Sequence, residues 1–364
     1  MKPEKHYNIT IVGAGNSGMA HAYVLSKLGH NVSVLKTSNS LHDDNFDEIE
    51  RSGGIWCVDE YKGAGRKFAH INCITRDDRK ALENAEIVLV LTQSLQHEAI
   101  AKRILPHIQN IKALLIVPGN MGSMYFRKGL PANVIVAEGE STIIDARIEK
   151  PGEVHILFKN VRNALAFNPA SDSEKGFQFF HDLLPQSYTH IRTNVIESAL
   201  NNPNMIVHTV GTIMSAGRIE YSRGEFWMYR EAFTPSVWKV LNALDAEKIK
   251  IMEAYGAKGE RYIDCCKFRN EEDLSTDSME VFRYYAENGS PKGPFNVNNR
   301  YVTEDVPNGL VLLSSLGEMA GIPTPTADAL ISIAGVMLDA DYRKSGRTPH
   351  SMGFSSREEL IANL

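Results

Sequence analysis

The sequence is poor in cysteine, has no excess of positive charge and contains no long hydrophobic run, and each shortage excludes a class of protein. Its four cysteines form no C-x-x-C pair and lack the histidine spacing of zinc sites, so we expect no metal site and free thiols in a reducing cytoplasm. A formal net charge of −5 argues against a nucleic-acid partner. No apolar run reaches the length of a membrane span and the first residues lack a signal-peptide core, so we expect a cytoplasmic protein with no membrane partner.

The 364 residues are enough for two domains, and the pattern of the sequence changes once along the chain. The first half alternates short apolar segments with helical ones, and residues 86–91 are almost entirely apolar, as in a parallel strand covered on both faces. The remainder is typical of an all-helical domain. We therefore predict an α/β Rossmann domain with a doubly wound, mostly parallel sheet over residues 1–188, an all-α C-terminal domain over residues 189–364, and substrate in the cleft between them.

Hydrophobic periodicity and turn residues predict the individual elements. In the first domain we predict strands over 9–12, 31–35, 86–91, 113–117, 133–137, 154–159, 163–167 and 188–192, a hairpin of 53–58 with 67–73 around Gly63-Ala64-Gly65, and helices over 19–28, 43–51, 76–84, 97–108 and 173–184. In the second domain we predict helices over 195–200, 204–214, 235–254, 306–320 and 327–342.

The residues between the first strand and the first helix match the dinucleotide-binding fingerprint G-x-G-x-x-G. Gly13 allows the tight turn, Gly15 lets the backbone approach a pyrophosphate, and Gly18 lets the helix pack close to the strand. The pyrophosphate then lies at the helix N-terminus, where free N–H groups favour an anion. A glycine-rich turn without a ligand is the alternative, but both strands and the helix of the fingerprint are present. The cofactor-binding residues predicted here are Gly13, Ala14, Gly15, Asn16, Ser17 and Gly18.

The end of the second strand bears on which cofactor is bound. Proteins that bind NAD usually carry an acid there, which binds the ribose 2′-hydroxyl. This chain has Lys36, Thr37 and Ser38 instead, an ammonium and two hydroxyls that suit a 2′-phosphate. We therefore predict a preference for NADP(H). NAD(H) is the alternative if it binds without the acid, or if Lys36 is simply solvated.

Loops after three further strands are also predicted to contact the cofactor, because ligands bind beyond the carboxyl ends of parallel strands. The turn after the strand over 113–117 is expected to face the nicotinamide half. The residues predicted for this role are Thr92, Gln93, Gly119 and Glu138.

The second domain contains a polar pair in an otherwise apolar helix. Asn202 is placed to cap this helix and Pro203 fits its first turn. Asn204 and His208 are four residues apart and therefore share a face. A lone histidine among apolar residues is more often a hydrogen-bonded core residue than a catalyst, so both interpretations of His208 stay open on these residues alone.

Motifs along nearly the whole chain resemble those of the octopine/nopaline (opine) dehydrogenase family. Single motifs are weak, but their order and spacing are specific. Besides the glycine-rich turn they are Pro118-Gly119, Arg147 with Pro151-Gly152, Asn202-x-Asn204-x-x-x-His208, Thr234-Pro235-Ser236-Val237, Asp245-Ala246-Glu247, Asn299-Arg300-Tyr301, Glu304-Asp305-Val306, Gly309-Leu310-Val311, Pro323-Thr324-Pro325 and Tyr342-Arg343-Lys344-x-Gly346-Arg347-Thr348. The resemblance implies that NAD(P)H reduces an imine formed from an α-keto acid and the amine of an amino acid.

The same resemblance implies roles for residues of the second domain. His208 and Asp305 would form the acid–base pair, and folding must then bring an Asp305 carboxylate oxygen within about 3.2 Å of a His208 ring nitrogen. Asn204 is predicted to lie in the substrate site. Arg300 is the candidate cation for a substrate carboxylate, with a structural ion pair as an equally good alternative. The expected partners are small molecules, a pyruvate-like α-keto acid and an amino acid, and we expect a homodimer.

Two other functions are alternatives. One is an NADPH-binding sensor without turnover, although the joint presence of His208 and Asp305 argues against it. The other is a hydroxy-acid dehydrogenase similar to ketopantoate reductase, which shares the two-domain plan but uses a lysine on the helical domain. No lysine replaces His208 here. Turnover of a keto acid without any amine would favour the second alternative.

Overall fold

The computed structural model describes residues 5–38, 41–60, 63, 65–185 and 187–364, so Ala64 of the predicted hairpin turn lies outside the described residues. The chain divides into two compact units, Met1–Ile191 and Arg192–Leu364. None of the described helices is both long enough and apolar enough to cross a bilayer. All four cysteines are free thiols.

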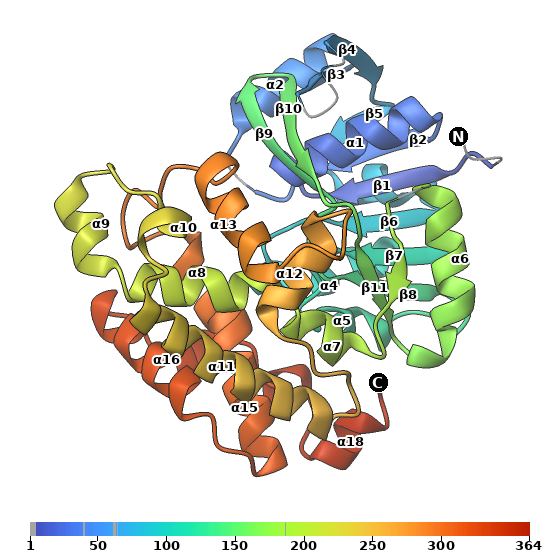
Figure 1. The fold of residues 1–364 in the computed structure, drawn as a ribbon. Helices are drawn as coiled ribbons and strands as arrows, with labels where there is room; N and C mark the ends of the chain where they lie inside the picture. The colour runs from blue at the N-terminus through green and yellow to red at the C-terminus, as the bar shows by residue number, and fades with distance from the viewer. Residues whose placement is uncertain (1–4, 39–40, 61–62, 64, 186) are drawn as a thin grey trace. The chain divides into compact units, whose positions relative to one another are not determined.

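The first unit contains all the strands of the described chain (Figure 1). They are β1 (Asn8–Val12), β2 (Asn31–Leu35), β3 (Gly54–Asp59), β4 (Arg66–His70), β5 (Cys73–Thr75), β6 (Ile87–Val90), β7 (Ala113–Ile116), β8 (Ile135–Gly139), β9 (Ile144–Lys150), β10 (Glu153–Lys159), β11 (Ala164–Phe167) and β12 (His190–Ile191). The helices of this unit are α1 (Asn16–Leu28), α2 (Asp43–Ser52), α3 (Asp78–Leu82), α4 (His97–Ile104), α5 (Ser123–Arg127) and α6 (Ser173–Leu183), with short 3₁₀ turns at η1 (Ser94–Gln96), η2 (Leu105–His107) and η3 (Ala170–Asp172).

The main sheet confirms the predicted Rossmann domain. Its eight strands run in the order β12-β11-β8-β7-β6-β1-β2-β5, and every pairing is parallel except that of β11 with β8. The chain leaves β1 toward β2 and β5 and then returns to β6 on the other side of β1, so the topological switch point lies between β1 and β6. Ligands of such sheets bind beyond the carboxyl ends of the strands at that point.

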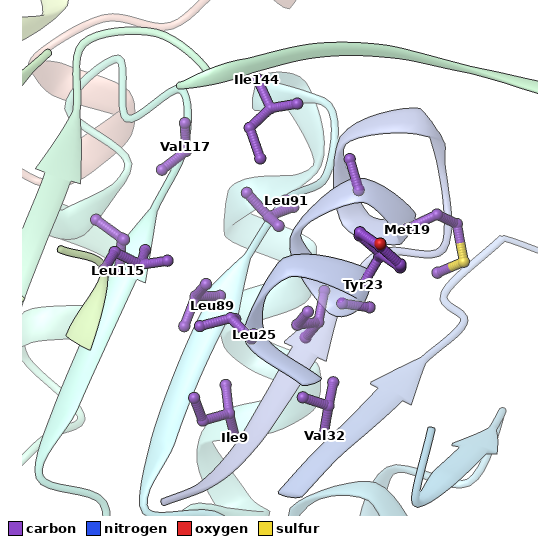
Figure 2. Close-up of a cluster of buried hydrophobic side chains, with 14 of the residues drawn as sticks. Ile9, Met19, Tyr23, Leu25, Val32, Leu89, Leu91, Leu115, Val117 and Ile144 are labelled. Atoms are coloured by element: carbon purple, nitrogen blue, oxygen red, sulfur yellow. The ribbon is translucent and has the colours of Figure 1, made fainter. Parts of the chain in front are cut away.

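Alternate residues of the main sheet pack on its two faces. On β6, Leu89 belongs to the apolar cluster that includes α1 and α6, whereas Val90 belongs to the cluster that includes α3, α4 and α5. Figure 2 shows Leu25 of α1 beside Leu89 of β6, and both belong to the same apolar cluster as Met19 and Ile9. Both faces of the sheet are therefore buried, as the apolar strands of the sequence predict.

A second, four-stranded sheet in the order β4-β3-β10-β9 was not predicted. Strand β10 pairs in parallel with β3, which lies far earlier in the sequence, and antiparallel with β9. The predicted strand over 67–73 is divided into β4 and β5, which join different sheets. Cys57, Ala146 and Val154 of the second sheet belong to the same apolar cluster as α1. This helix is thus held by both sheets, which fixes the position of its N-terminus.

The second unit is all-α among its described residues, as predicted. Its elements are α7 (Val195–Leu200), α8 (Pro203–Ile213), α9 (Ala216–Ser222), α10 (Met228–Glu231), α11 (Pro235–Ala254), α12 (Tyr262–Asn270), α13 (Ser278–Asn288), α14 (Arg300–Thr303), the π-helical turn η4 (Val306–Leu310), α15 (Val311–Ala320), α16 (Pro325–Met337), α17 (Tyr342–Ser345), the 3₁₀ turn η5 (His350–Met352) and α18 (Arg357–Ile361).

Two differences from the predicted helices have local causes. The single helix predicted over 327–342 is wrong, because α16 ends at Met337, Asp339 adopts a left-handed φ of 49°, and the Asp341 side chain caps α17 by accepting the Lys344 N–H. Helices α12 and α13 were not predicted, because charged residues interrupt their apolar periodicity.

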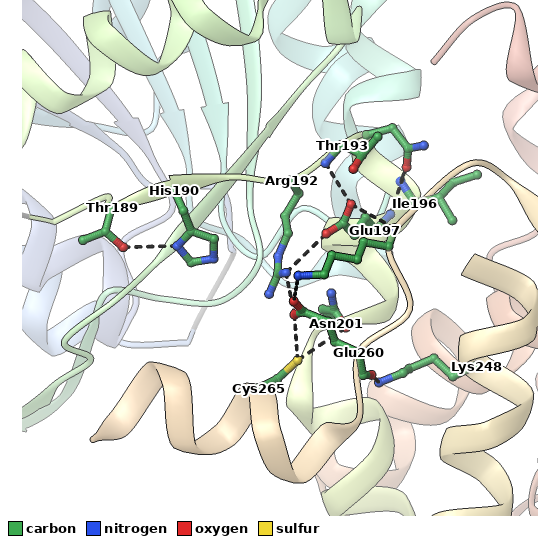
Figure 3. Close-up of polar contacts among 12 residues, drawn as sticks. Thr189, His190, Arg192, Thr193, Ile196, Glu197, Asn201, Lys248, Glu260 and Cys265 are labelled. Carbon is green, nitrogen blue, oxygen red and sulfur yellow. Dashed lines mark hydrogen bonds and ion pairs between the residues drawn. The ribbon is translucent and has the colours of Figure 1, made fainter. Parts of the chain in front are cut away.

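A buried ion-pair network orders the start of the second unit (Figure 3). The Arg192 guanidinium lies 3.2 Å from Glu197 Oε1 and 2.8 Å from Glu260 Oε2. Cys265 Sγ donates to the same Glu260 carboxylate at 3.2 Å. Although burial opposes ionisation, hydrogen bonds from Arg192 and Lys258 lower the pKa of Glu260 to about 2. The network ties α7 to the α11–α12 connection, and Cys265 is part of this structural contact.

Candidate active site

The three glycines after β1 occupy positions that need a glycine for different structural reasons. Gly13 has a φ of 119°, and a Cβ added there would lie 2.5 Å from the Leu91 carbonyl oxygen. A Cβ on Gly18 would lie 1.9 Å from the Gly13 carbonyl oxygen, so this glycine lets α1 approach β1. A Cβ on Gly15 would meet nothing within 4 Å. Ala14, between them, is buried. Protein packing thus requires Gly13 and Gly18, whereas open space at Gly15 suits an approaching ligand.

The N-terminus of α1 carries donors suited to such a ligand. Gly15 is the N-cap residue and no side chain caps this helix, so its first N–H groups lack helical partners. Asn16 Oδ1 accepts the Ile148 N–H at 2.9 Å, and Ser17 Oγ lies 3.3 Å from Thr142 Oγ1. Both side chains therefore bind within the protein, and the backbone N–H groups remain for an anion. These residues fit the pyrophosphate of a dinucleotide.

Thr92 follows β6, the strand that pairs with β1 beside this turn. Its hydroxyl is buried and has no hydrogen-bond partner among the described residues. Gln93, the next residue, is exposed. A buried hydroxyl without a partner is costly, so a polar group of a ligand at this position would satisfy it. The prediction that Thr92 and Gln93 contact the cofactor stays compatible with their placement.

Glu138 orders the loop after β7 and does not present a free carboxylate. It is fully buried, its Oε2 accepts the Met121 N–H at 2.9 Å, and its Oε1 accepts the Ser123 N–H at 2.8 Å. A Cβ on Gly119 would lie 2.2 Å from Glu138 Oε2, so Gly119 makes room for this carboxylate. Glu138 thus supports the loop backbone through both oxygens, and the expected contact of this buried residue with the cofactor stays a prediction.

The loop that Glu138 supports contains strained backbone. Asn120 and Met121 both have left-handed φ values, 48° and 60°. Such conformations cost about 1–3 kcal/mol each and persist where surrounding contacts enforce them. Asn120 Nδ2 also donates to Ser94 Oγ at 2.9 Å, which joins this loop to the one after β6. The loops after β6 and β7 therefore form one ordered structure at the carboxyl edge of the sheet.

Lys36 is buried, contrary to the prediction that it presents an ammonium to a 2′-phosphate. Its side chain is 0% exposed, and Nζ lies 2.9 Å from Asp43 Oδ1. The ammonium donates to Ser38 Oγ at 2.9 Å and to the Leu41 carbonyl oxygen at 2.7 Å. These donors are used inside the β2–α2 loop, so a direct contact with a phosphate is not available to Lys36. Thr37 and Ser38 are partly exposed and remain candidates.

Arg76 is a cation at this edge that sequence reasoning missed. It pairs with the same Asp43, donates to the Ser38 carbonyl oxygen at 2.7 Å, and lies 4.9 Å from the centre of the Phe46 ring. Its side chain is 40% exposed. The signal that was available is its position directly after β5, since β5 is parallel to β2 and ends at the same edge.

In the second unit, α8 carries His208 and folds locally as predicted. Pro203 is the first helical residue, and the Asn202 side chain caps the helix by accepting the Asn204 N–H at 3.1 Å. His208 Nδ1 lies 2.9 Å from Asp305 Oδ2, which confirms the predicted distance between these residues. The two residues are 97 positions apart in sequence. Only folding brings them together.

The His208–Asp305 pair is largely removed from solvent. The side chains are 11% and 15% exposed. Burial raises the pKa of the Asp305 carboxyl, and the hydrogen bond from His208 opposes that rise without cancelling it. An ionised Asp305 accepts from His208 Nδ1–H, so the lone pair of a neutral His208 lies on Nε2. Among the described residues, no hydrogen bond joins Nε2 to a protein group, so Nε2 is the ring nitrogen available to a ligand.

The two residues predicted for the substrate site lie near this pair in sequence and structure. Arg300 Nε donates to Glu304 Oε2 at 2.6 Å, so the structural ion pair foreseen as an alternative is present. The Arg300 side chain is nevertheless 68% exposed, so its carboxylate-binding role stays a prediction. Asn204 is partly buried, one helical turn before His208.

Tyr301 is the site residue that sequence reasoning passed over. Its ring stacks on the His208 imidazole, with the ring centroids 3.6 Å apart and the planes 13° from parallel. The available signal was its place in the Asn299-Arg300-Tyr301 motif, four residues before Asp305. Within the part of the chain that the structure describes, no group of histidine, cysteine, aspartate and glutamate side chains has the arrangement of a metal site.

The family model for the α-helical domain of NAD/NADP octopine/nopaline dehydrogenase matches residues 191–338, and a pyridine nucleotide-disulphide oxidoreductase model matches residues 8–50. An opine dehydrogenase from Arthrobacter sp. (strain 1C) is 31% identical to this chain, over 95% of this chain and 94% of that protein. An octopine dehydrogenase solved with NADH and agmatine has a TM-score of 0.77 at 16% identity, covering 98% of both chains. A yersinopine dehydrogenase solved with NADP+ has a TM-score of 0.75 at 14% identity, again covering 98% of both chains. The chain therefore belongs to the octopine/nopaline dehydrogenase family, and it is an NAD(P)-dependent oxidoreductase that acts on CH–NH donors.

Proposed function

We propose that this opine dehydrogenase joins the amine of an amino acid to a pyruvate-like α-keto acid, and that His208 and Asp305 move the protons of the reaction. The observation that carries this proposal is the 2.9 Å hydrogen bond between His208 Nδ1 and Asp305 Oδ2 in a site largely removed from solvent. Histidine titrates near neutral pH, and a carboxylate on its other nitrogen fixes the tautomer and stabilises the imidazolium.

The condensation defines what the pair must do. The free amine attacks the keto carbon, and the carbinolamine that forms loses its hydroxyl as water to leave a protonated imine. We assign to His208 Nε2 the acceptance of the proton that the substrate ammonium loses and its return to the departing hydroxyl. When bound, the reduced nicotinamide supplies the hydride that completes the secondary amine.

Both proposed substrates carry a carboxylate, which needs a cation in the site. Arg300 is our candidate, because its side chain is 68% exposed despite the ion pair with Glu304 and because it lies five residues before Asp305. Charge-assisted pairing of arginine with a carboxylate also fixes orientation. We assign Asn204 to the same site because it shares a helix face with His208.

We also propose that NADP(H) is preferred, now through Arg76 together with Thr37 and Ser38. Arg76 supplies the partly exposed cation at the strand ends, and its position beside Ser38 supports this assignment. The buried Lys36 neutralises Asp43, which reduces the repulsion that this carboxylate would exert on a phosphate. Comparing kcat/KM for NADPH and NADH tests the preference. Arg76→Ala should reduce it, and equal or better efficiency with NADH in the unmodified enzyme would contradict it.

The substrate proposal is tested by following the oxidation of NADPH and of NADH. The assays contain pyruvate alone, each common amino acid alone, or pyruvate together with one amino acid. Turnover should require both substrates, and His208→Asn should lower kcat by about 10²–10⁴ with cofactor affinity nearly intact, the usual size of general acid–base catalysis. Turnover of a keto acid without amine would favour the hydroxy-acid dehydrogenase. Cofactor binding without turnover of any pair would favour the sensor.

The homodimer and the cytoplasmic location stay predictions. Light scattering on the purified protein measures its mass in solution and tests the first, since a single copy of the chain has a mass of 40.5 kDa. Cell fractionation tests the second.

A further inference from the structure

The stacking of Tyr301 on His208 is unusually close for a pair of rings. The centroids are 3.6 Å apart and the planes nearly parallel, whereas Trp238 and Phe282 in the same unit are 5.0 Å apart and close to perpendicular. Aromatic pairs usually have centroids about 4.5–7 Å apart. The Tyr301 ring therefore covers one face of the imidazole at van der Waals distance.

The segment that supplies Tyr301 also supplies Asp305. Tyr301 lies in α14, and the Asn299 side chain caps this short helix by accepting the Tyr301 N–H at 2.8 Å. The Arg300–Glu304 ion pair spans the same turn. Residues four apart on a helical segment lie on one face, so Tyr301 and Asp305 reach His208 together from one ordered segment.

The two contacts constrain different motions of the His208 ring. The hydrogen bond to Asp305 holds Nδ1, but a hydrogen bond tolerates a range of angles, so the ring can still tilt by rotation about its Cβ–Cγ bond. The terminal torsion of histidine is broad and does not restrict this rotation by itself. A ring stacked on the face of the imidazole does restrict it. Together the two contacts determine the direction in which Nε2 points.

The Tyr301 ring is itself held in place. It packs against an apolar cluster of the second unit, whose buried members are Ile219, Phe226, Met228, Ala232 and Val297. A ring supported in this way can transmit the rigidity of the helical unit to His208. Precise placement matters, because a misplacement of about 1 Å can cost 10²-fold in rate.

We propose that Tyr301 is a positioning residue for His208, acting through its ring and not through its hydroxyl. This inference rests on the proposed acid–base role of His208. The requirement is therefore for an aromatic ring at position 301, so Tyr301→Phe should retain activity and Tyr301→Leu should not.

The test compares Tyr301→Phe, Tyr301→Leu and the control Phe233→Leu. Phe233 packs on the same apolar cluster, and its ring contacts among the described residues are with Tyr229, Trp238 and Phe282 and not with His208. Tyr301→Leu should lower kcat by about 10–10²-fold with the Kd for reduced cofactor unchanged. Tyr301→Phe should stay close to the unmodified enzyme. Phe233→Leu should lower the melting temperature while kcat is retained.

A spectroscopic measurement separates positioning from loss of packing. In protein labelled at histidine, the carbon-bound ring protons of His208, assigned by their absence in His208→Asn, should show an upfield ring-current shift. Tyr301→Phe should keep that shift and Tyr301→Leu should lose it.

Three results would overturn the inference: full kcat in Tyr301→Leu, equal impairment in Tyr301→Phe and Tyr301→Leu, or an unchanged His208 spectrum in Tyr301→Leu. Failure of the proposed function itself looks different, because His208→Asn would then remain active.

Discussion

Replacing Asp305 by asparagine tests the acid–base pair most directly. The two side chains have nearly the same shape, so the substitution changes charge and hydrogen-bonding capacity with little change in packing. Asp305 is 15% exposed, and burial already disfavours its charged form. Removing that charge therefore relieves a desolvation cost, and we expect Asp305→Asn to fold with an unchanged or slightly higher melting temperature.

We expect Asp305→Asn to lower kcat, for two reasons. A hydrogen bond to a charged group contributes about 1.5–3 kcal/mol, which corresponds to about 10–10²-fold when it stabilises the imidazolium in the transition state. The amide of asparagine can also donate to His208 Nδ1, which would place the ring proton on Nε2 and remove the base. The two effects together predict a loss in kcat on the order of 10²–10⁴.

The assay is the initial rate of NADPH oxidation with saturating keto acid and amino acid, together with Kd for NADPH in the absence of substrates. Asp328→Asn is the matched control, because Asp328 in the same unit is 42% exposed and pairs with Arg343. That variant should keep its turnover. If Asp305→Asn retains near-normal kcat while His208→Asn is inactive, Asp305 does not orient or stabilise His208 and the reasoning fails.

Three further predictions concern the carboxylate, the cofactor turn and pH. Arg300→Met should raise KM for one carboxylate substrate more than it changes cofactor affinity, and an unchanged KM for both substrates would remove Arg300 from the site. Gly15→Ala should keep the melting temperature and weaken cofactor binding, since a Cβ there meets no protein atom within 4 Å. Gly18→Ala should instead lower the melting temperature, because its Cβ would lie 1.9 Å from the Gly13 carbonyl oxygen. Calorimetry and cofactor titration of both variants separate the two effects. Burial lowers the pKa of His21 from 6.5 to about 4. As the pH falls, the unfolded chain therefore binds a proton at this residue before the folded chain does. The free energy of unfolding should fall by roughly 3 kcal/mol as the pH decreases from 6.5 to 4. Denaturant unfolding from pH 7 to pH 4 should be less pH-dependent in His21→Gln, and equal slopes would contradict the assignment.

Local sequence features were enough to predict the glycine-rich turn after β1 and the start of helix α8, which carries His208. The strand β1, the turn with Gly13 and the helix α1 follow one another without interruption, so their geometry depends on backbone conformations and hydrogen bonds among near neighbours. The same holds for Asn202 and Pro203 at the start of α8. The distance between His208 and Asp305 was expected only from the family resemblance, because no local rule relates residues so far apart in sequence.

Tertiary structure decided which polar side chains are available for chemistry. Lys36 and Glu138 stand at strand ends, where the sequence predicts cofactor contacts, yet both turn inward because nearby backbone groups and Asp43 satisfy them better than solvent does. Arg76 remains partly exposed at the same edge, although no motif in the sequence predicted a cofactor contact for it.

The second sheet and the contact of Tyr301 with His208 also arose only on folding. Strand β10 pairs with β3, which lies far earlier in the sequence. The periodicity of each strand predicts that one of its faces is buried, but it does not predict which strand it pairs with. Likewise, the identity of Tyr301 predicts a partly buried ring and does not predict which ring it covers. Sequence by itself determined the local conformations and the set of chemical groups in this protein. The packing of distant segments determined which of those groups meet, because contacts between them depend on side-chain shape and burial that no short stretch of sequence contains.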